Sequence, residues 1–205
     1  AAARLCGFDP ETTTRAISIG FSTAAGSKLQ FGTMTKPLHA GMAAMNGLLA
    51  ARYAAAGITA APEPLDVPWG FRDLYVGDGS PGYQKAADGI GDPPALERYG
   101  LKVKIHPNCA SVHTAVDALL DLMREHDLKS GDIDAIETVV NKVSYENLRF
   151  DDPKSEMEAR FSMQYAVALA VLKGRMTLAD YRADAIGDPE IRAWYPKITM
   201  TMAPE

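Results

Sequence analysis

Reactive side chains gather at three points along this chain, and the first is the run GTMTKPLHAG at residues 32–41. It holds the lysine Lys36, the imidazole of His39 and the hydroxyls of Thr33 and Thr35. A helix is predicted to start here, so free backbone N–H groups and the positive end of the helix dipole would lie beside Lys36. The arrangement suits a carboxylate or a phosphate. An ordinary helix start, with a capping threonine, a solvated lysine and a surface histidine, fits the same residues.

The second point is the run KIHPNCASVH at residues 104–113, which contains two of the four histidines. Lys104 and His106 are two residues apart on a predicted strand and would face the same side. Cys109 and His113 are four apart at a predicted helix start and would share one face. The alternative is a metal site formed by His106, Cys109 and His113, although their spacing matches no known zinc pattern. We therefore predict no metal.

The third point is Arg160, in the run EARFS at residues 158–162. It is expected in the first turn of a helix, where its planar guanidinium would bind a carboxylate through two parallel hydrogen bonds. A salt bridge within the chain, to Glu156 or to an aspartate, is the alternative.

Several common catalytic motifs are absent from the sequence. There is no glycine-rich dinucleotide or phosphate loop and no nucleophile elbow, so nothing indicates nicotinamide, ATP or a serine nucleophile. Lysine, histidine and arginine without a cofactor motif favour acid–base chemistry on an anion.

The bulk properties narrow the class of partner. The 205 residues carry a net charge of -5, which argues against a nucleic-acid or anionic membrane surface. Their hydrophobic content of 47% is ordinary for a globular protein. No apolar run reaches the roughly 18 residues that span a membrane, and we see no signal peptide. Two cysteines outside any CxxC pair fit a reducing cytosol, so a cytoplasmic location is predicted. Both ends of the sequence read as cuts through a larger fold.

Helix signals dominate the first half of the chain. Asp9 and Pro10 would open a helix that runs to about residue 25 and buries Ala16, Ile17, Phe21 and Ala24. A second helix, residues 35–56, has many small residues and an apolar stripe, and is expected to be buried in a bundle. The stripe consists of Leu38, Met42, Met45, Leu49 and Tyr53. Residues 58–100 are rich in glycine and proline, and short helices are expected near 70–75 and 82–87.

The second half mixes strands and helices. Strands are predicted at residues 101–105, 133–143 and 197–202, and a helix at 111–126. Capping boxes at Ser155 and Thr177 predict a helix to residue 173 and a short helix after it. The fold class is therefore α+β.

The three runs together, in this order, resemble the MmgE/PrpD family. The family signatures look like GTMTKPLHAG at 32–41, KIHPNC at 104–109 with His113 and Asp117 after it, and EARFS at 158–162. The family includes 2-methylcitrate dehydratase, cis-aconitate decarboxylase and iminodisuccinate epimerase. Since none of these enzymes needs a metal or an organic cofactor, the resemblance implies that no cofactor is required.

The resemblance also implies a domain arrangement. Family members pair a large all-helical domain with a smaller α+β lid, and the active site lies between them. Residues 1–99 would be the last part of the helical domain and residues 100–205 the lid. Lys36 matches a lysine of the helical side and Lys104 one of the lid. The N-terminal helical region of the family, which supplies an acidic residue and histidines, has no counterpart here, and His106 stands where the family more often has tyrosine.

We therefore expect a cofactor-independent lyase, similar to 2-methylcitrate dehydratase, that removes a proton next to a carboxylate of a small polycarboxylate. Epimerisation and decarboxylation are the alternatives. Lys36 and Lys104 would grip the substrate, and His39 or His106 would carry the proton. The expected substrate-binding residues are Thr33, Thr35, Cys109, His113 and Arg160.

A non-catalytic role in binding or assembly is also open, as is a split enzyme or a fragment of a longer one. The second helix needs partners that this chain hardly supplies. We therefore expect exposed apolar surface, a homodimer that covers it, or association with the missing helical half.

Overall fold

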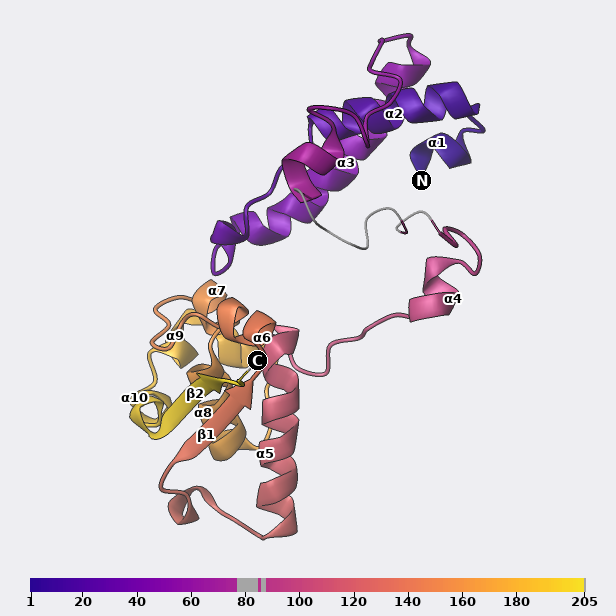
Figure 1. Ribbon diagram of the computed structural model, residues 1–205. Helices are drawn as coiled ribbons and strands as arrows, with labels where there is room; N and C mark the ends of the chain where they lie inside the picture. The colour runs from indigo at the N-terminus through magenta and orange to yellow at the C-terminus, as the bar shows by residue number, and fades with distance from the viewer. Residues whose placement is uncertain (77–84, 86–87, 205) are drawn as a thin grey trace. The chain divides into compact units, whose positions relative to one another are not determined.

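The computed structural model describes residues 1–76, 85 and 88–204. The chain divides into two compact units (Figure 1). The first consists of Ala1–Ser27 and Pro37–Lys102, and the second of Lys28–Lys36 and Val103–Glu205. A short segment from the first half of the sequence thus belongs to the second unit, whereas the resemblance assigns all of residues 1–99 to one domain. The helix expected at 82–87 lies largely outside the described residues.

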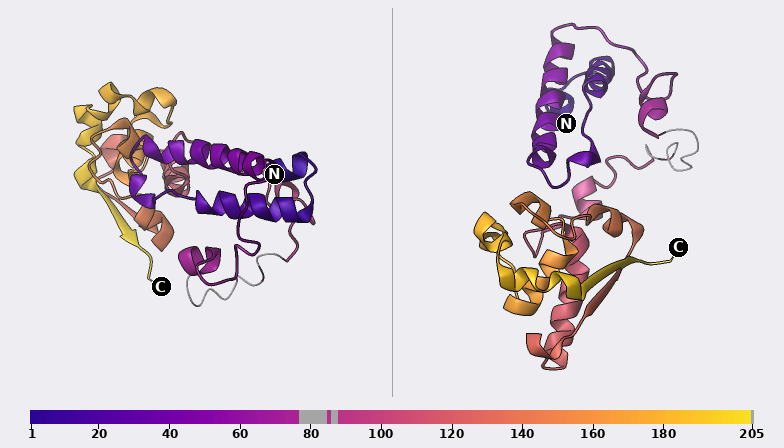
Figure 2. Two further views of the ribbon diagram at one scale, coloured as in Figure 1. Left: turned by 90° about the horizontal axis from the view of Figure 1, so that it is seen from above. Right: turned by 90° about the vertical axis from the view of Figure 1, so that its left-hand side faces the viewer.

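The first unit is helical. Its elements are α1 (Ala2–Leu5), α2 (Pro10–Ser22), most of α3 (Thr35–Ala55), η2 (Arg72–Val76) and α4 (Ala95–Tyr99). The predicted N-cap of α2 is confirmed, because the Asp9 carboxylate accepts a hydrogen bond of 2.7 Å from the Thr12 amide. α2 and α3 lie side by side (Figure 2) and bury a small alanine cluster of Ala16, Ala51 and Ala54. Only Ala16 of the residues predicted to be buried in α2 is buried, since Ile17 is half exposed and Ala24 is exposed.

Four of the five residues in the apolar stripe of α3 are exposed, and Leu49 is partly buried. Leu38 is 56% exposed, Met45 54% and Tyr53 44%, whereas the buried residues of the helix are alanines near its C-terminal end. The prediction that the stripe is buried is wrong for this chain, while the exposed apolar surface expected of the chain is present. The physical reason is that the buried cluster at this helix is small: Ala51 and Ala54 pack with Ala16 and Ile19 of α2, Ala2 of α1 and Phe8.

The second unit combines helices with a two-stranded sheet, which is consistent with the predicted α+β class. Strands β1 (Ile136–Val140) and β2 (Ile198–Met202) are parallel, with Ile136 opposite Ile198. The longer helices are α5 (His113–Glu125), α6 (Lys142–Asn147) and α8 (Met163–Lys173). The short ones are η1 (Lys28–Gln30), η4 (Ala110–Val112), η5 (Ser130–Asp132), α7 (Glu156–Ala159), η6 (Leu178–Tyr181), α9 (Ala183–Ile186), α10 (Pro189–Arg192) and η7 (Tyr195–Lys197).

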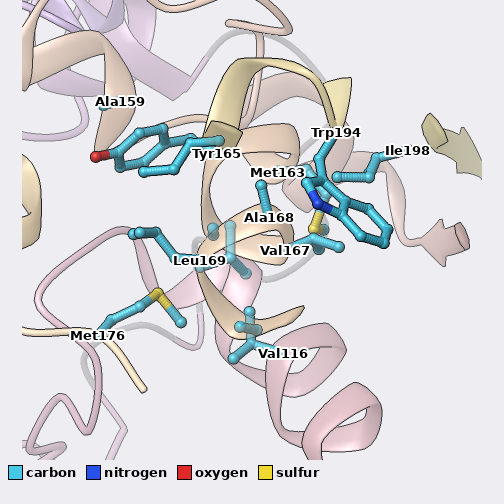
Figure 3. Packing of buried hydrophobic residues seen from close by; sticks show 14 of the residues in the cluster. Val116, Ala159, Met163, Tyr165, Val167, Ala168, Leu169, Met176, Trp194 and Ile198 are labelled. Carbon is cyan, nitrogen blue, oxygen red and sulfur yellow. The ribbon is translucent and has the colours of Figure 1, made fainter. Parts of the chain in front are cut away.

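Helix α8 forms the centre of the second unit. All residues from Met163 to Val171 are buried, and the helix is apolar on every side, as expected of a helix inside a core. Figure 3 shows Val116 of α5 approaching it from one side, and Trp194 and Ile198 lying beside Met163 and Val167. Complete burial of a side chain such as Leu169 contributes about 1.5–3 kcal/mol. This core fixes the elements that carry the candidate site.

Three predicted elements differ from those in the structure. Residues 101–105 form no strand, because no described strand pairs with them, and Leu101, Val103 and Ile105 are exposed. The helix predicted from the Ser155 capping box to residue 173 is broken into α7 and α8. The Ser162 hydroxyl accepts a hydrogen bond of 3.1 Å from the Tyr165 amide and so begins a new helix. The strand predicted at 133–143 is also shorter, since Asn141 caps α6.

Candidate functional site

The break between α7 and α8 is the junction at which the candidate site is assembled. Arg160 is the C-cap of α7 instead of a first-turn residue. Its carbonyl oxygen accepts a hydrogen bond of 2.9 Å from the Cys109 amide, and its Nη1 donates to the Pro107 carbonyl at 3.2 Å. No ion pair of Arg160 occurs among the described residues, so the salt bridge to Glu156 is not formed there. The junction instead holds the segment from residue 107 to residue 109.

A histidine–carboxylate pair lies at the start of this segment. His106 is only 7% exposed, and its Nε2 lies 2.8 Å from Oδ1 of Asp117, which projects from α5. The ring of His113 meets His106 edge-on at a centroid distance of 5.0 Å. Burial lowers the pKa of His113, and the positive charges of His106 and Lys104 lower it further. Burial thus favours the neutral form of His113, whose Nε2 is buried and without a hydrogen-bond partner in the described structure.

Asn108 links the segment to the core of the unit. Its side-chain Nδ2 donates to the Tyr181 hydroxyl at 2.7 Å. Its backbone carbonyl oxygen accepts a hydrogen bond of 2.6 Å from Nζ of Lys104. Tyr181 is completely buried, which raises the pKa of its hydroxyl well above the ordinary value. The guanidinium of Arg160 lies 5.4 Å from the same ring. One buried phenol thus contacts both Asn108 and Arg160.

Three buried polar atoms around this segment lack partners in the described structure. They are Oδ1 of Asn108, Nε2 of His113 and Nε of Arg160. Buried polar groups are usually satisfied by protein, water or a ligand, so unpartnered atoms that cluster indicate a place for a polar guest. A guanidinium and an ammonium beside an imidazole–carboxylate pair are able to bind an anion and to exchange a proton with it.

Lys36 belongs to the second unit as well. Its Nζ lies 5.6 Å from the centre of the Phe31 ring and 5.9 Å from that of Phe161, the neighbour of Arg160 in sequence. Both segments that hold a predicted site lysine, Lys36 and Lys104, therefore contact the residues of the junction. Thr33 donates its hydroxyl hydrogen to the Gln30 carbonyl at 2.8 Å, whereas the Thr35 side chain is exposed in the first turn of α3.

His39 lies in the first unit, where its ring faces Gly26. The second unit contains the other predicted residues: Lys36, Thr33, Thr35, Lys104, His106, Cys109, His113 and Arg160. No role was predicted for Asn108 or Tyr181, and Asp117 was named only as part of a family signature. Asp117 follows His113 by four residues on α5, a spacing that places both on one helix face and could have indicated it.

The described residues contain no group of three or more His, Cys, Asp or Glu side chains arranged to hold a metal ion. Within the described part of the chain, no helix combines the length and the apolar character that crossing a membrane requires.

Comparison with known proteins gives matches over both parts of the chain. The model of the MmgE/PrpD N-terminal domain matches residues 1–84, and that of the MmgE/PrpD C-terminal domain matches residues 106–205.

Similar curated proteins include the cis-aconitate decarboxylase of Homo sapiens, which is 30% identical over all of this chain and 43% of its own length. The cis-aconitate decarboxylase of Mus musculus is 27% identical over all of the chain and 42% of its own length. That of Aspergillus terreus is 25% identical over all of the chain and 45% of its own length. The chain thus spans less than half the length of these relatives. Because the two domain models cover both parts of the chain in order, the chain belongs to the MmgE/PrpD family.

Proposed function

We propose that the full-length protein is a lyase that acts on a small polycarboxylate, and that the second unit binds the anionic groups of this substrate. The observation that carries the proposal is the turn at residues 104–109. There Lys104, the His106–Asp117 pair and Arg160 gather around buried polar atoms that lack partners. The family and the names of the relatives support the lyase class.

The cations of the site have a direct role in this chemistry. Removal of a proton or of CO2 next to a carboxylate leaves negative charge on the substrate, and fixed positive groups stabilise that charge. Two unit charges 4 Å apart interact by about 4 kcal/mol at an effective dielectric constant of about 20. Lys104 and Arg160 are proposed to hold one carboxylate and Lys36 another. Cys109 and His113 would line the same site, with Thr33 and Thr35 near Lys36.

His106 is the proposed proton carrier of the second unit. Asp117 engages Nε2 of the ring, so the second ring nitrogen is the one available to a substrate. The Asp117 carboxylate would fix the orientation of the imidazole. His39, the other predicted carrier, lies in the first unit and stays a prediction.

Decarboxylation of an acid similar to cis-aconitate is the reaction that the relatives favour. The carbon–carbon bond to one carboxylate breaks, CO2 leaves, and the electron pair that stays on carbon takes a proton from an acid of the site. Dehydration of a 2-methylcitrate-like acid and epimerisation would use the same cations and the same proton carrier. The choice among them is a matter for assay.

The test is turnover by the full-length protein of cis-aconitate, 2-methylcitrate and iminodisuccinate. We expect Lys104→Ala to lower kcat/KM about 10- to 100-fold, since a hydrogen bond to a charged group contributes about 1.5–3 kcal/mol. Lys129→Ala is the matched control, because Lys129 is an exposed lysine of the same unit whose ammonium pairs with nearby Asp127. Unchanged turnover in Lys104→Ala would remove that residue from the site. No turnover of any of the three acids by the parent protein would favour the non-catalytic alternative.

A further inference from the structure

The segment Lys28–Lys36 is held in the second unit by a contact that the proposed function does not use. We propose that Arg149 is a positioning residue, which holds the turn at residues 28–31 and thereby sets the place of Lys36 in the site. The inference rests on the proposed role of Lys36 in binding a carboxylate. It adds a residue that lies outside the three runs singled out in the sequence.

The contact is a single guanidinium against three carbonyl groups. Nη2 of Arg149 donates to the carbonyl oxygens of Lys28 at 3.1 Å, Leu29 at 3.0 Å and Phe31 at 3.4 Å. Arg149 follows α6 by two residues, and these partners are more than one hundred residues away in sequence. Hydrogen bonds from a charged donor are stronger than neutral ones. The guanidinium therefore ties the turn at residues 28–31 to the rest of the second unit.

Phe150, the neighbour of Arg149, packs against the same turn. Gly32 is buried with a φ of 85°, and a methyl group built on it would lie 2.6 Å from Cε2 of Phe150. Phe31 packs on Phe161 with ring centres 4.9 Å apart. Arg149 thus binds the carbonyl side of the turn while Phe150 fills the space that Gly32 leaves open. Together they fix the turn in one position.

The position of the turn is passed on to Lys36 through backbone hydrogen bonds. The Thr33 amide donates to the Gln30 carbonyl at 3.1 Å, and the Lys36 amide donates to the Thr33 carbonyl at 3.4 Å. The Lys36 ammonium then lies near the rings of Phe31 and Phe161. Because Phe161 adjoins Arg160, a displaced turn would move Lys36 away from the junction that carries the other cations.

A salt bridge at the same turn is too weak to do this work. Lys28 and Glu146 are 3.6 Å apart, and both side chains are about half exposed. Exposed pairs of this kind contribute at most about 1 kcal/mol. The carbonyl contacts of Arg149 are therefore the stronger of these two polar ties to the turn.

The experiment compares Arg149→Ala, Arg149→Lys and the control Arg124→Ala in the full-length protein. Arg124 is an exposed arginine of the same unit whose ion pair is local, with Asp121. Amide hydrogen exchange measures the turn, and kcat and KM for the acid that the parent protein turns over measure the site. We expect Arg149→Ala to speed exchange at Phe31, Thr33 and Lys36 at least tenfold and to raise KM at least tenfold. Arg149→Lys should restore both values only in part, because the lysine side chain is shorter than that of arginine and would hold its ammonium short of the position of Nη2.

The two readouts separate the possible failures. A purely structural role would reduce the active fraction, which lowers kcat and leaves KM unchanged, and that result would overturn the inference. Unchanged exchange at the turn in Arg149→Ala would overturn it as well, even if the protein is a working lyase. If the parent protein turns over none of the acids, the proposed function fails. The exchange rates then still decide whether Arg149 positions the Lys36 segment.

Discussion

Removal of the Tyr181 hydroxyl tests whether the site is built on the buried hydrogen bond between Asn108 and Tyr181. In Tyr181→Phe the ring stays in place, so the change opens no cavity beyond one oxygen atom. Nδ2 of Asn108 loses its partner at 2.7 Å and keeps only the sulfur of Met176 at 3.4 Å, a weak acceptor. Oδ1 of Asn108 already lacks a partner in the described structure.

The magnitude follows from these contacts. A buried donor left without a good acceptor costs about 1–3 kcal/mol. The weak sulfur contact offsets part of that cost, so we expect Tyr181→Phe to lower the free energy of unfolding by about 1–2 kcal/mol. Asn108→Ala removes the other partner. The double variant should therefore lose less than the sum of the two single changes, with a coupling energy of about 1 kcal/mol.

Denaturant unfolding followed by Trp194 fluorescence measures these values, because Trp194 is buried in the second unit. A Trp69→Phe background removes the signal of Trp69, which lies in the first unit. The transition midpoint should move while its slope stays constant. A free energy of unfolding for Tyr181→Phe within about 0.3 kcal/mol of the parent value, or a coupling energy near zero, would refute the reasoning.

Two further predictions concern the same unit. Gly32→Ala should destabilise it by about 2–5 kcal/mol, through a strained positive φ and a clash with Phe150. The control Gly131→Ala meets open space and should change stability by less than about 0.5 kcal/mol. Equal changes of the melting temperature in the two variants would contradict this. Burial lowers the pKa of His113 in the folded state, so below about pH 6.5 the unfolded chain binds the extra proton and stability falls as the pH drops. His113→Gln should therefore show a smaller loss of unfolding free energy between pH 7.5 and pH 5, and an equal loss would count against a neutral buried imidazole.

The predictions of helix starts from local capping residues were the most reliable. Asp9, Ser155 and Thr177 cap helices as predicted, because a cap depends on residues within one turn. The alternation at residues 101–105 was misleading, since a strand also needs a neighbour. The break before α8 was hidden because Ser162 lies inside a run with strong helix signals.

The candidate site was only partly predictable for the same reason. The motifs identified Lys104, His106 and Arg160, which are close in sequence to other reactive residues. They did not identify Tyr181 or Arg149. The Asn108–Tyr181 bond spans 73 residues and the Arg149 contacts about 120, so only the tertiary fold brings these groups to the site.

The segment Lys28–Lys36 also limits how the two units can be exchanged between relatives. The backbone passes from one unit to the other after Ser27, after Lys36 and after Lys102. A chimaera joined only at residue 102 would combine the native turn with a foreign partner for its three carbonyl groups. The second unit is discontinuous in sequence. A graft that keeps the proposed anion-binding site intact therefore has to carry residues 28–36 together with the second half of the sequence.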